Sequence, residues 1–378
     1  MKRDLFVSAF APTLGSGRAL RTYTTVRALA ALGPLDLAYV PYEGAGPSPE
    51  YQAIEGVDFH EIAPSRGIAR ARAYARKRAE GYPRDIARGC SPELMATAER
   101  LATAPGRGRV VAGDLNSMAA LMPLARSREV IYNAHNVESS YRHAQNGKRL
   151  WTWLSIVAVE RRTLGRVAES WMVSHADMDR ARKLVPGAKL RYVPNVVDVA
   201  AITPAPPRPP GAAPAVLMVA DYTYTPNASG LAMLAGDIMP RVWAELPEAR
   251  LVLVGRGADP AALGDARIET LGFVDDLGAA YTRADAVAVP LTTGGGTPLK
   301  FVEALAYGKA IVATPLAADG LDVDAGVHFA CGTDAGSFAQ ELLGVLRDED
   351  RARELGREAR ALAEREYSVQ TLTRLIAV

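Results

Sequence analysis

Residues 292–308 read TTGGGTPLKFVEALAYG and follow the apolar run AVAVP at residues 286–290. A short apolar run that ends in turn residues predicts a buried strand. The glycines after it predict a loop, and Thr297 and Pro298 predict the N-cap and the first residue of a helix. A strand that passes through a glycine loop into a helix is the repeating unit of a parallel α/β sheet.

The same alternation of short apolar runs with helical patterns continues along the rest of the chain. It predicts strands at residues 5–10, 35–40, 109–112, 130–134, 170–174 and 190–193, and a later group at residues 216–220, 250–254, 286–290 and 310–313. We therefore expect the α/β class, with parallel sheets covered on both faces by crossover helices.

A proline-rich segment separates these two groups of strands. Residues 203–214 read TPAPPRPPGAAP, which neither a helix interior nor a central strand accommodates. A chain of 378 residues is also long enough for about two domains. We expect an N-terminal domain at residues 1–202, a linker at 203–214 and a C-terminal domain at 215–364. The amphipathic segment from about residue 365 to 378 is expected to dock, with the first domain as its candidate partner.

The composition narrows the function classes. The 44 Lys and Arg residues nearly balance the 42 Asp and Glu residues, which argues against a nucleic-acid partner because such proteins carry a basic surplus. Cys90 and Cys331 lack the spacing of a disulfide framework or a zinc site. The apolar run near the start of the chain is too short for a signal peptide. No apolar stretch reaches membrane-spanning length. We expect a cytoplasmic protein, with peripheral contact at the inner membrane face as an open alternative.

The glycine loop of the opening segment has the features of an anion site. Gly295 and Gly296 let the backbone approach a ligand closely, and the exposed amides and dipole of the next helix favour a phosphate there. Lys300 lies in the first turn, where a cation opposes the helix dipole, so a bound diphosphate would explain its position. A solvated lysine is the alternative.

Glu303 follows in the same helix, within an apolar turn. A buried carboxylate needs hydrogen-bond donors, and a pair of ribose hydroxyls would supply them. The alternative is that Glu303 faces solvent from one side of an amphipathic helix.

A second glycine loop, LGSGR at residues 14–18, follows the first predicted strand. Its amides at Gly15, Ser16 and Gly17 are candidates to close over the same phosphates, although a tight turn would use the same glycines. The loop is not a GxGxxG fingerprint, and the run VGRGAD at residues 254–259 lacks the third glycine of a nicotinamide site. A dehydrogenase is therefore disfavoured.

His135 and Asn136 end the predicted strand VIYNAHN, at the carboxyl end where open sheets present ligand-binding groups. A histidine there can donate to a sugar hydroxyl or stabilise charge near the reacting carbon, and a hydrogen-bonded structural histidine is the alternative. The motifs HExxH and GxSxG do not occur, so metal-assisted and serine hydrolysis have no support.

A basic segment at residues 66–88 begins with Arg66 and ends with Arg88. The segment contains eight basic residues and only two acidic ones, Glu80 and Asp85. Such a run can present a basic surface to an anionic acceptor or to a membrane. The alternative is a helix face that is simply solvated.

Several motifs resemble those of the retaining GT-B glycosyltransferases of family 4. In the second domain the resemblance rests on VLMVADYTYTPNASGL, ARLVLVGRG, LGFVDDLGAAYTRADAVAVPL and GGGTPLKFVEALAYGKAIVATPLAADGL, and in the first on APTLGSG, YNAHNVES and YVPNVVD. The resemblance implies the GT-B fold, two Rossmann-like parallel-sheet domains facing across a cleft. It also implies transfer of a sugar from a nucleoside-diphosphate sugar of UDP or GDP type, with retention of configuration and without a metal or other cofactor.

Residue roles follow from the same resemblance. Glu303 would bind the ribose, and Lys300 would hold the diphosphate together with Gly296 and Thr297. Phe273 and Val274 would lie beside the base. The complete candidate set comprises two catalytic residues, His135 and Lys300, and the substrate-binding residues Gly15, Ser16, Gly17, Asn136, Asn227, Arg256, Phe273, Val274, Gly295, Gly296, Thr297, Pro298, Leu299 and Glu303.

Two departures from the family pattern keep other functions open. Gly295 stands where the family often has a second glutamate, and Asp221, Tyr222 and Asn227 stand where it commonly has arginine and lysine. The alternatives are a nucleotide-sugar epimerase of the same fold and a non-catalytic partner subunit that binds a nucleotide sugar. The expected partners are a nucleotide sugar and a small-molecule, glycan or lipid-linked acceptor.

Overall fold

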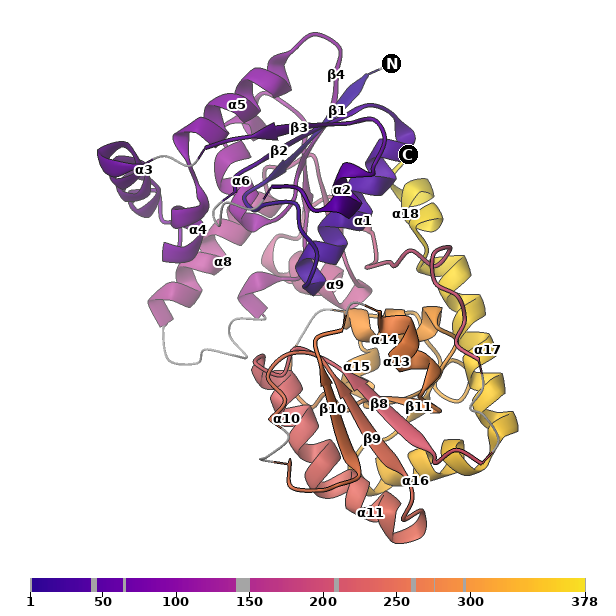
Figure 1. The fold of residues 1–378 in the computed structure, drawn as a ribbon. Helices are drawn as coiled ribbons and strands as arrows, with labels where there is room; N and C mark the ends of the chain where they lie inside the picture. Colours follow the sequence, from indigo (N-terminus) through magenta and orange to yellow (C-terminus); the bar gives the residue numbers. More distant parts are fainter. Residues whose placement is uncertain are drawn as a thin grey trace. The chain divides into compact units, whose positions relative to one another are not determined.

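The computed structural model describes residues 2–41, 46–63, 66–140, 150–206, 211–259, 263–274, 276–294 and 297–377. The chain divides into two compact units, Met1–Pro194 with Leu372–Val378 and Asn195–Thr371 (Figure 1). The predicted phosphate-binding residues Gly295 and Gly296 lie outside the described residues, as does part of the proline-rich segment at 207–210.

The division between the units falls upstream of the predicted boundary at residue 202. Residues 195–202 stay with the second unit because Arg360 donates hydrogen bonds to the carbonyl oxygens of Val199 and Ile202, at 3.1 and 2.8 Å. The end of the chain joins the first unit, where Arg191 donates to the Leu375 carbonyl at 2.9 Å. Residues 365–371 remain with the second unit.

The first unit is built on a seven-stranded parallel sheet with the order β3-β2-β1-β4-β5-β6-β7. Its strands are β1 (Arg3–Ser8), β2 (Leu35–Tyr39), β3 (Val57–Glu61), β4 (Arg107–Ala112), β5 (Val130–Asn133), β6 (Glu169–Met172) and β7 (Leu190–Tyr192). The edge strand β3 was not predicted, because its sequence VDFHE has no apolar run and its side chains are only partly buried.

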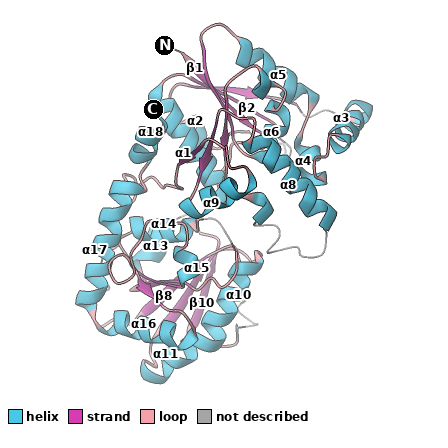
Figure 2. Cartoon of the chain, turned by 180° about the vertical axis from the view of Figure 1, so that it is seen from behind, coloured by secondary structure: helices cyan, strands magenta, loops and turns pink. Residues whose placement is uncertain are grey.

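Helices cover both faces of this sheet (Figure 2). They are α1 (Gly17–Leu32), α2 (Pro49–Gln52), α3 (Gly67–Ala79), α4 (Arg84–Gly89), α5 (Pro92–Thr103), α6 (Leu115–Leu121), the 3₁₀ turn η1 (Leu124–Arg126), α8 (Leu150–Leu164) and α9 (His175–Leu184). On one face, Leu5, Val110 and Val130 pack against Leu94 and Met118 in a single apolar core.

The second unit contains a six-stranded parallel sheet with the order β10-β9-β8-β11-β12-β13. The strands are β8 (Ala215–Val219), β9 (Arg250–Val254), β10 (Ile268–Gly272), β11 (Ala286–Val289), β12 (Ala310–Ala313) and β13 (Ala330–Cys331). Neither edge strand, β10 or β13, was predicted from the sequence. The side chains of β10 are mostly half-buried, and β13 is only two residues long.

Helices also cover both faces of the second sheet. They are α10 (Thr225–Met233), the π-helical turn η2 (Leu234–Ile238), α11 (Met239–Glu245), α13 (Leu277–Thr282), α14 (Leu299–Ala306), α15 (Pro315–Ala318), α16 (Ala335–Arg347) and α17 (Glu349–Glu366), and α18 (Val369–Ile376) runs across the division at residue 371. No described helix combines the length and the apolar character needed to cross a bilayer.

Each sheet has one point at which the strand order reverses. The chain starts at β1 or β8, winds toward one edge, and returns to the other side of that first strand with β4 or β11. In open parallel sheets, ligands bind outside the carboxyl ends of the strands at such a switch point. Two places in the molecule therefore qualify as sites, one beside β1 and β4 and one beside β8 and β11.

Candidate functional site

In the second unit, predicted site residues follow four adjacent strands at their carboxyl ends. Asn227 lies in the first turn of α10 after β8, and Arg256 is the second residue after β9. Phe273 follows β10, and Lys300 lies in the first turn of α14 after β11. The sheet therefore brings together residues that are far apart in the sequence.

A hydrogen bond joins the two sides of the switch point. Lys300 Nζ donates to Asn227 Oδ1 at 2.5 Å, and Asn227 Nδ2 donates to the carbonyl oxygen of Asp221 at 2.8 Å. The Asp221 carboxylate in turn pairs with Arg256 at 2.7 Å. Lys300 is thus held by a neutral amide oxygen, and no carboxylate among the described residues forms an ion pair with it.

Burial shifts the ionisation of both charged groups on α14. Burial lowers the pKa of Lys300 to about 8, while nearby Glu303 acts in the opposite direction. Burial raises the pKa of Glu303 to about 7, and Lys300 partly offsets that shift. The Glu303 side chain is half-buried, and no described residue donates a hydrogen bond to it. Both side chains are half-buried, so neither the lysine nor the glutamate is fully exposed to solvent.

The start of α14 differs from the prediction by one residue. Pro298, with an extended ψ of 111°, occupies the N-cap position, and no side-chain hydrogen bond caps the helix. Thr297 was predicted as the cap, but it precedes that position, and its carbonyl oxygen accepts a hydrogen bond from Asn195 at 3.3 Å. Leu299 is the first helical residue. The amide of Phe301 donates to the Pro298 carbonyl at 3.0 Å, whereas no described residue accepts from the amides of Leu299 and Lys300, which leaves these two for a ligand.

Gly255, the first glycine of the VGRG run, allows close packing between two strand ends. Gly255 has φ 126°, and a Cβ on it would lie 1.7 Å from the carbonyl oxygen of Ala220, which follows β8. Only glycine allows the ends of β8 and β9 to approach this closely. Close packing between the two strand ends therefore explains this glycine.

Phe273 is an exposed aromatic side chain at the same edge of the sheet. It retains 66% of its accessible surface, and Val274 beside it is half-buried. An aromatic ring exposed to this extent next to a cluster of polar groups offers a flat surface for a ligand.

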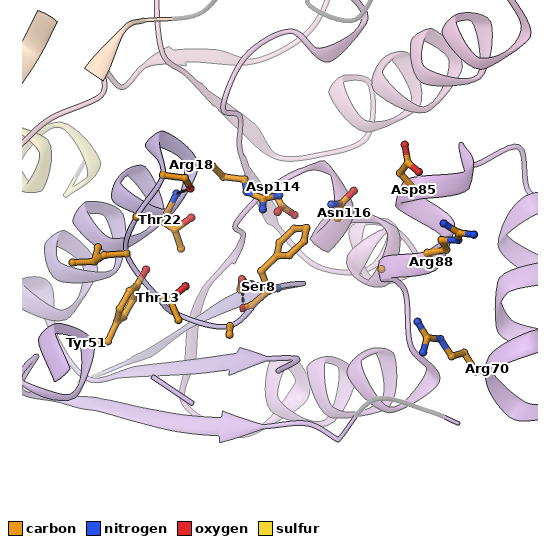
Figure 3. A pocket seen from close by; sticks show the side chains of 17 residues that line it. Ser8, Thr13, Arg18, Thr22, Tyr51, Arg70, Asp85, Arg88, Asp114 and Asn116 are labelled. Carbon is orange, nitrogen blue, oxygen red and sulfur yellow. Dashed lines mark hydrogen bonds between the residues drawn. The ribbon is translucent and has the colours of Figure 1, made fainter. Parts of the chain in front are cut away.

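The first unit contains a cavity of about 460 Å³ at the carboxyl ends of β1 and β4 (Figure 3). A volume of this size is typical of small-molecule sites. Its lining includes predicted and unpredicted residues: Ser8, Phe10, Thr13, Gly15, Ser16, Arg18, Thr22, Tyr51, Arg70, Asp85, Arg88, Asp114 and Asn116. Of the predicted set, only Gly15 and Ser16 line it.

The predicted glycine loop forms one wall of this cavity. Ser16 is the N-cap of α1, and its hydroxyl accepts a hydrogen bond from the amide of Ala19 at 3.2 Å. Gly15 has φ 108°, a conformation that glycine adopts without strain. Gly17 is the first residue of the helix. Here the first turn carries its own cap, unlike α14.

His135 lies on a small extension of about 60 Å³ that shares Arg18, Asp114 and Asn116 with the larger cavity. Its Nε2 lies 2.8 Å from the Gly113 carbonyl oxygen, which accepts only, so Nε2 carries the proton. Burial and the charge of Arg21 lower the pKa of His135 to about 3. The predicted roles of donor to a sugar hydroxyl and of charged stabiliser are corrected: the neutral ring offers a ligand only the acceptor Nδ1.

We expect His135 to stay neutral throughout the physiological range. Its pKa is about 3 in the folded state against an ordinary 6.5, so its contribution to stability is complete above pH 6.5 and is lost as the pH falls toward 3. NMR titration of the labelled histidine rings, with His135→Gln to identify the resonance, should show no protonation of His135 between pH 8 and about 5. A midpoint near 6.5 would show that the ring is not desolvated.

Asn136 follows His135 and is half-buried. Its Oδ1 is buried without a hydrogen-bond partner among the described residues. Buried unsatisfied amide oxygens are uncommon in folded proteins, so a ligand or a water molecule is the expected partner.

Two polar residues that shape this region, Asp114 and Glu160, were not predicted. Asp114, at the end of β4, caps α6 by accepting a hydrogen bond from the Ser117 amide at 2.7 Å, and it also lines both cavities. Glu160 is buried on α8 and accepts from the amides of Glu138 and Ser139, which fixes the segment after His135. The rule that pointed to His135, a polar residue at the carboxyl end of a strand, also applies to Asp114. No local pattern points to Glu160.

A metal site is not apparent in the described residues. Across them, no three side chains of His, Cys, Asp or Glu are grouped so as to hold an ion. The donors that the two sites offer are cations, amides and hydroxyls, which suit an anionic and hydroxylated ligand.

Comparison with known proteins agrees with this chemistry. Residues 213–348 match the family described as Glycosyl transferases group 1. Phosphatidyl-myo-inositol mannosyltransferase from Mycolicibacterium smegmatis is 30% identical over 198 residues, which are 49% of this chain and 49% of that protein. The same enzyme from Mycobacterium tuberculosis strain H37Rv is 30% identical over 167 residues, 42% of each chain. The chain spans about half the length of the curated relatives it matches.

Solved structures match nearly the whole chain. Sucrose-phosphate synthase from Thermosynechococcus elongatus superposes with a TM-score of 0.74 at 18% identity, over 99% of this chain and 97% of that one. Anabaena Alr3699/HepE in complex with UDP-glucose gives 0.71 at 15% identity, over 100% and 98%. At such identities the likeness shows the fold alone. The predicted fold class is confirmed: two parallel-sheet α/β domains, of seven and six strands, match those of GT-B glycosyltransferases.

Proposed function

We propose that this protein is a glycosyltransferase that moves a sugar from a nucleoside-diphosphate sugar, of UDP or GDP type, to a hydroxyl of a glycan or lipid-linked acceptor. The uncapped N-terminus of α14, with Lys300 held at the switch point by Asn227, carries the proposal. This segment lies within the residues that match the glycosyltransferase family. The names of the similar mannosyltransferases favour mannose as the donor sugar.

The donor is assigned to the second unit through its nucleoside diphosphate. The free amides of α14 and the Lys300 ammonium group would bind the diphosphate, because both stabilise negative charge. The Glu303 carboxylate, which no described residue satisfies, would accept hydrogen bonds from the ribose hydroxyls. Phe273 and Val274 would contact the base, and Arg256 would flank the nucleotide.

The acceptor is assigned to the cavity of the first unit. Gly15 and Ser16 belong to its lining, and their predicted contact with the donor phosphates stays a prediction. The neutral His135 would accept a hydrogen bond at Nδ1 from a hydroxyl of either sugar. Such contacts orient the reacting groups, which is a main source of rate enhancement in transfer reactions.

Transfer itself would proceed with retention of configuration and without a protein nucleophile. The bond between the anomeric carbon and the phosphate oxygen breaks, the acceptor oxygen bonds to the same face of that carbon, and the leaving phosphate takes the acceptor proton. Lys300 and the amides of α14 would stabilise the charge that develops on the leaving group. The scheme assigns no step to a metal ion or to another cofactor.

A cytoplasmic location at the inner membrane face belongs to the same proposal. Lipid-linked acceptors reside in the membrane, and the relatives' names specify a phosphatidyl-myo-inositol acceptor for those proteins. The two cysteines are free thiols, which fits a reducing compartment.

The proposal is tested by incubating the protein with a panel of UDP-sugars and GDP-sugars, with and without phosphatidylinositol vesicles. Release of the nucleoside diphosphate with formation of a glycosylated lipid supports a transferase, and NMR of the product reports the anomeric configuration. A changed sugar in the absence of acceptor would instead identify an epimerase. If no donor binds or reacts, the function is wrong.

A further inference from the structure

Tyr281, on α13, is a fully buried tyrosine whose hydroxyl lacks a hydrogen-bond partner. In the described part of the second unit, this hydroxyl is the single buried side-chain polar atom without a hydrogen bond. Buried tyrosine hydroxyls usually find a partner. Tyr222 in the same unit does so by donating to the Met218 carbonyl at 2.7 Å. The unpartnered hydroxyl of Tyr281 therefore requires an explanation.

The ring of Tyr281 is held against the helix that carries Glu303. Helices α13 and α14 lie side by side (Figures 1 and 2), and the Tyr281 ring stacks on that of Tyr307 with the ring centres 4.0 Å apart. Tyr307 follows Glu303 by four residues at the end of α14, and residues at this spacing lie on the same side of a helix. Helical side chains also lean toward the N-terminus. The stack therefore places Tyr281 on the side of α14 that carries Glu303.

The electrostatics agree with this placement. Burial raises the pKa of the Tyr281 hydroxyl well above its ordinary value, and the Glu303 carboxylate raises it further, ahead of Tyr307. The hydroxyl therefore keeps its proton throughout the physiological range. A proton donor without an acceptor and a carboxylate without a donor thus belong to the same part of the second unit.

The other charged groups around α14 already have partners. Lys300, on the same helix, lowers the pKa of Glu303 and donates to Asn227. Arg360 of α17 donates to the Ala306 carbonyl and pairs with Glu364. The strands β11 and β12, which pack against α14, carry no charged residue. Asp276 caps α13 through the Ala279 amide, and its charge acts on Tyr307.

A bound nucleotide would separate the Glu303 carboxylate from water. The side chain is half-buried, and a ribose on it would cover the exposed part. A carboxylate can accept about four hydrogen bonds, so two ribose hydroxyls leave part of that capacity unused. An ionised carboxylate that is buried with too few donors is costly. Tyr281 can supply the missing donor from inside the protein.

We propose that Tyr281 is a positioning residue of the donor site, whose hydroxyl donates to one oxygen of the Glu303 carboxylate when the nucleotide binds and leaves the other oxygen to the ribose. This bond keeps Glu303 ionised in the complex and fixes its orientation. The inference rests on the proposed function, and it adds a residue that acts through Glu303 without touching the substrate.

Tyr281→Phe removes the hydroxyl and keeps the ring that stacks on Tyr307. Because the hydroxyl makes no bond in the unliganded protein, the variant should melt at the same temperature as the wild type or higher. It should nevertheless bind UDP or GDP about ten-fold more weakly at about pH 7.5, since a hydrogen bond to a charged group is lost in the complex. Calorimetric titration measures the affinity, and thermal denaturation measures the stability.

Two comparisons separate this role from a structural one. The ten-fold difference should shrink as the pH falls below 7, because protonation of Glu303 removes the charge that strengthens the bond. In a Glu303→Ala background, Tyr281→Phe should leave nucleotide affinity unchanged, because the acceptor of the hydroxyl is absent. Such a double-mutant cycle isolates the interaction between the two residues.

Tyr367→Phe is the matched control. Tyr367 is also fully buried in the second unit, but its hydroxyl accepts a hydrogen bond from the Asp322 amide at 2.7 Å. Loss of this hydroxyl should lower the melting temperature and leave nucleotide affinity as in the wild type. The two variants therefore have opposite expected effects on stability and on binding.

Wild-type affinity in Tyr281→Phe would overturn the inference. So would a loss of affinity that persists in the Glu303→Ala background, or a clear fall in the melting temperature of the unliganded variant, because either would show a structural role for the hydroxyl. A wild-type protein that binds neither nucleotide would instead count against the proposed function itself.

Discussion

Replacing Glu303 with alanine is expected to weaken the binding of UDP or GDP by about a hundred-fold. The carboxylate is half-buried, has no donor among the described residues, and carries a pKa raised to about 7 by burial. Two hydrogen bonds from ribose hydroxyls to a charged acceptor contribute together about 3 kcal/mol, which corresponds to that change in Kd. Calorimetric titration of the unliganded protein with each nucleotide measures it directly.

The pH dependence of nucleotide binding follows from the same two groups. The ionised form of Glu303 accepts the ribose hydroxyls, so affinity should rise as the pH increases through about 7. Lys300, with a pKa lowered to about 8, loses its charge above that value, so affinity should fall again. The Glu303→Gln variant should lack the rise at the lower pH and keep the fall at the higher one.

A matched control for Glu303 is Glu358 on α17. It is also half-buried in the second unit, but it pairs with Arg357 at 2.6 Å. Glu358→Ala should leave nucleotide affinity unchanged. An unchanged nucleotide affinity in Glu303→Ala would show that Glu303 does not bind the ribose. Equal losses of affinity in both variants would indicate damage to the fold of the unit.

Replacing Lys300 with alanine is expected to lower the transfer rate by about a hundred-fold to a thousand-fold, the range seen when one group that stabilises a developing negative charge is removed. The ammonium group contacts the neutral Asn227 amide at 2.5 Å, and no carboxylate in the described part of the chain pairs with it directly. Its charge is therefore free to act on the leaving diphosphate. Single-turnover rates at saturating donor separate this effect from weaker binding.

Lys309 provides the comparison for Lys300. Burial lowers the pKa of both lysines to about 8, but Lys309 Nζ donates to the carbonyls of Ala284 and Pro206 at 2.7 and 3.1 Å. Lys309→Met should lower stability and leave the rate per folded molecule intact. If the Lys300→Ala variant transferred sugar at the wild-type rate, another group would have to stabilise the charge on the leaving diphosphate.

The sequence predicted the central strands and missed the edges. Central strands such as β11 and β12 are buried on both faces, so their sequences are continuous apolar runs that pattern analysis detects. The edge strands β3 and β10 face partly outward and carry polar residues such as Asp58, His60 and Glu269. Their pairing is decided by the neighbouring strand, which no local pattern contains.

The candidate site was predictable where it depends on position along a strand or helix. Lys300, Glu303 and Asn227 lie at the carboxyl edge of one sheet, as their places in the sequence indicated. The neutral state of His135 was not predictable, because its lowered pKa comes from burial and from the charge of Arg21. Its tautomer depends on the carbonyl of Gly113, which follows a neighbouring strand. For the same reason no pattern within residues 66–88 could show that Arg88 lines a cavity while Lys77 is buried.

The most direct measurement is a crystal structure of the protein with UDP or GDP bound. The diphosphate should lie at the first turn of α14 within hydrogen-bonding distance of Lys300 Nζ, with the ribose hydroxyls on the Glu303 carboxylate. A nucleotide bound elsewhere, with the start of α14 empty at full occupancy, would contradict the proposed donor site and the function derived from it.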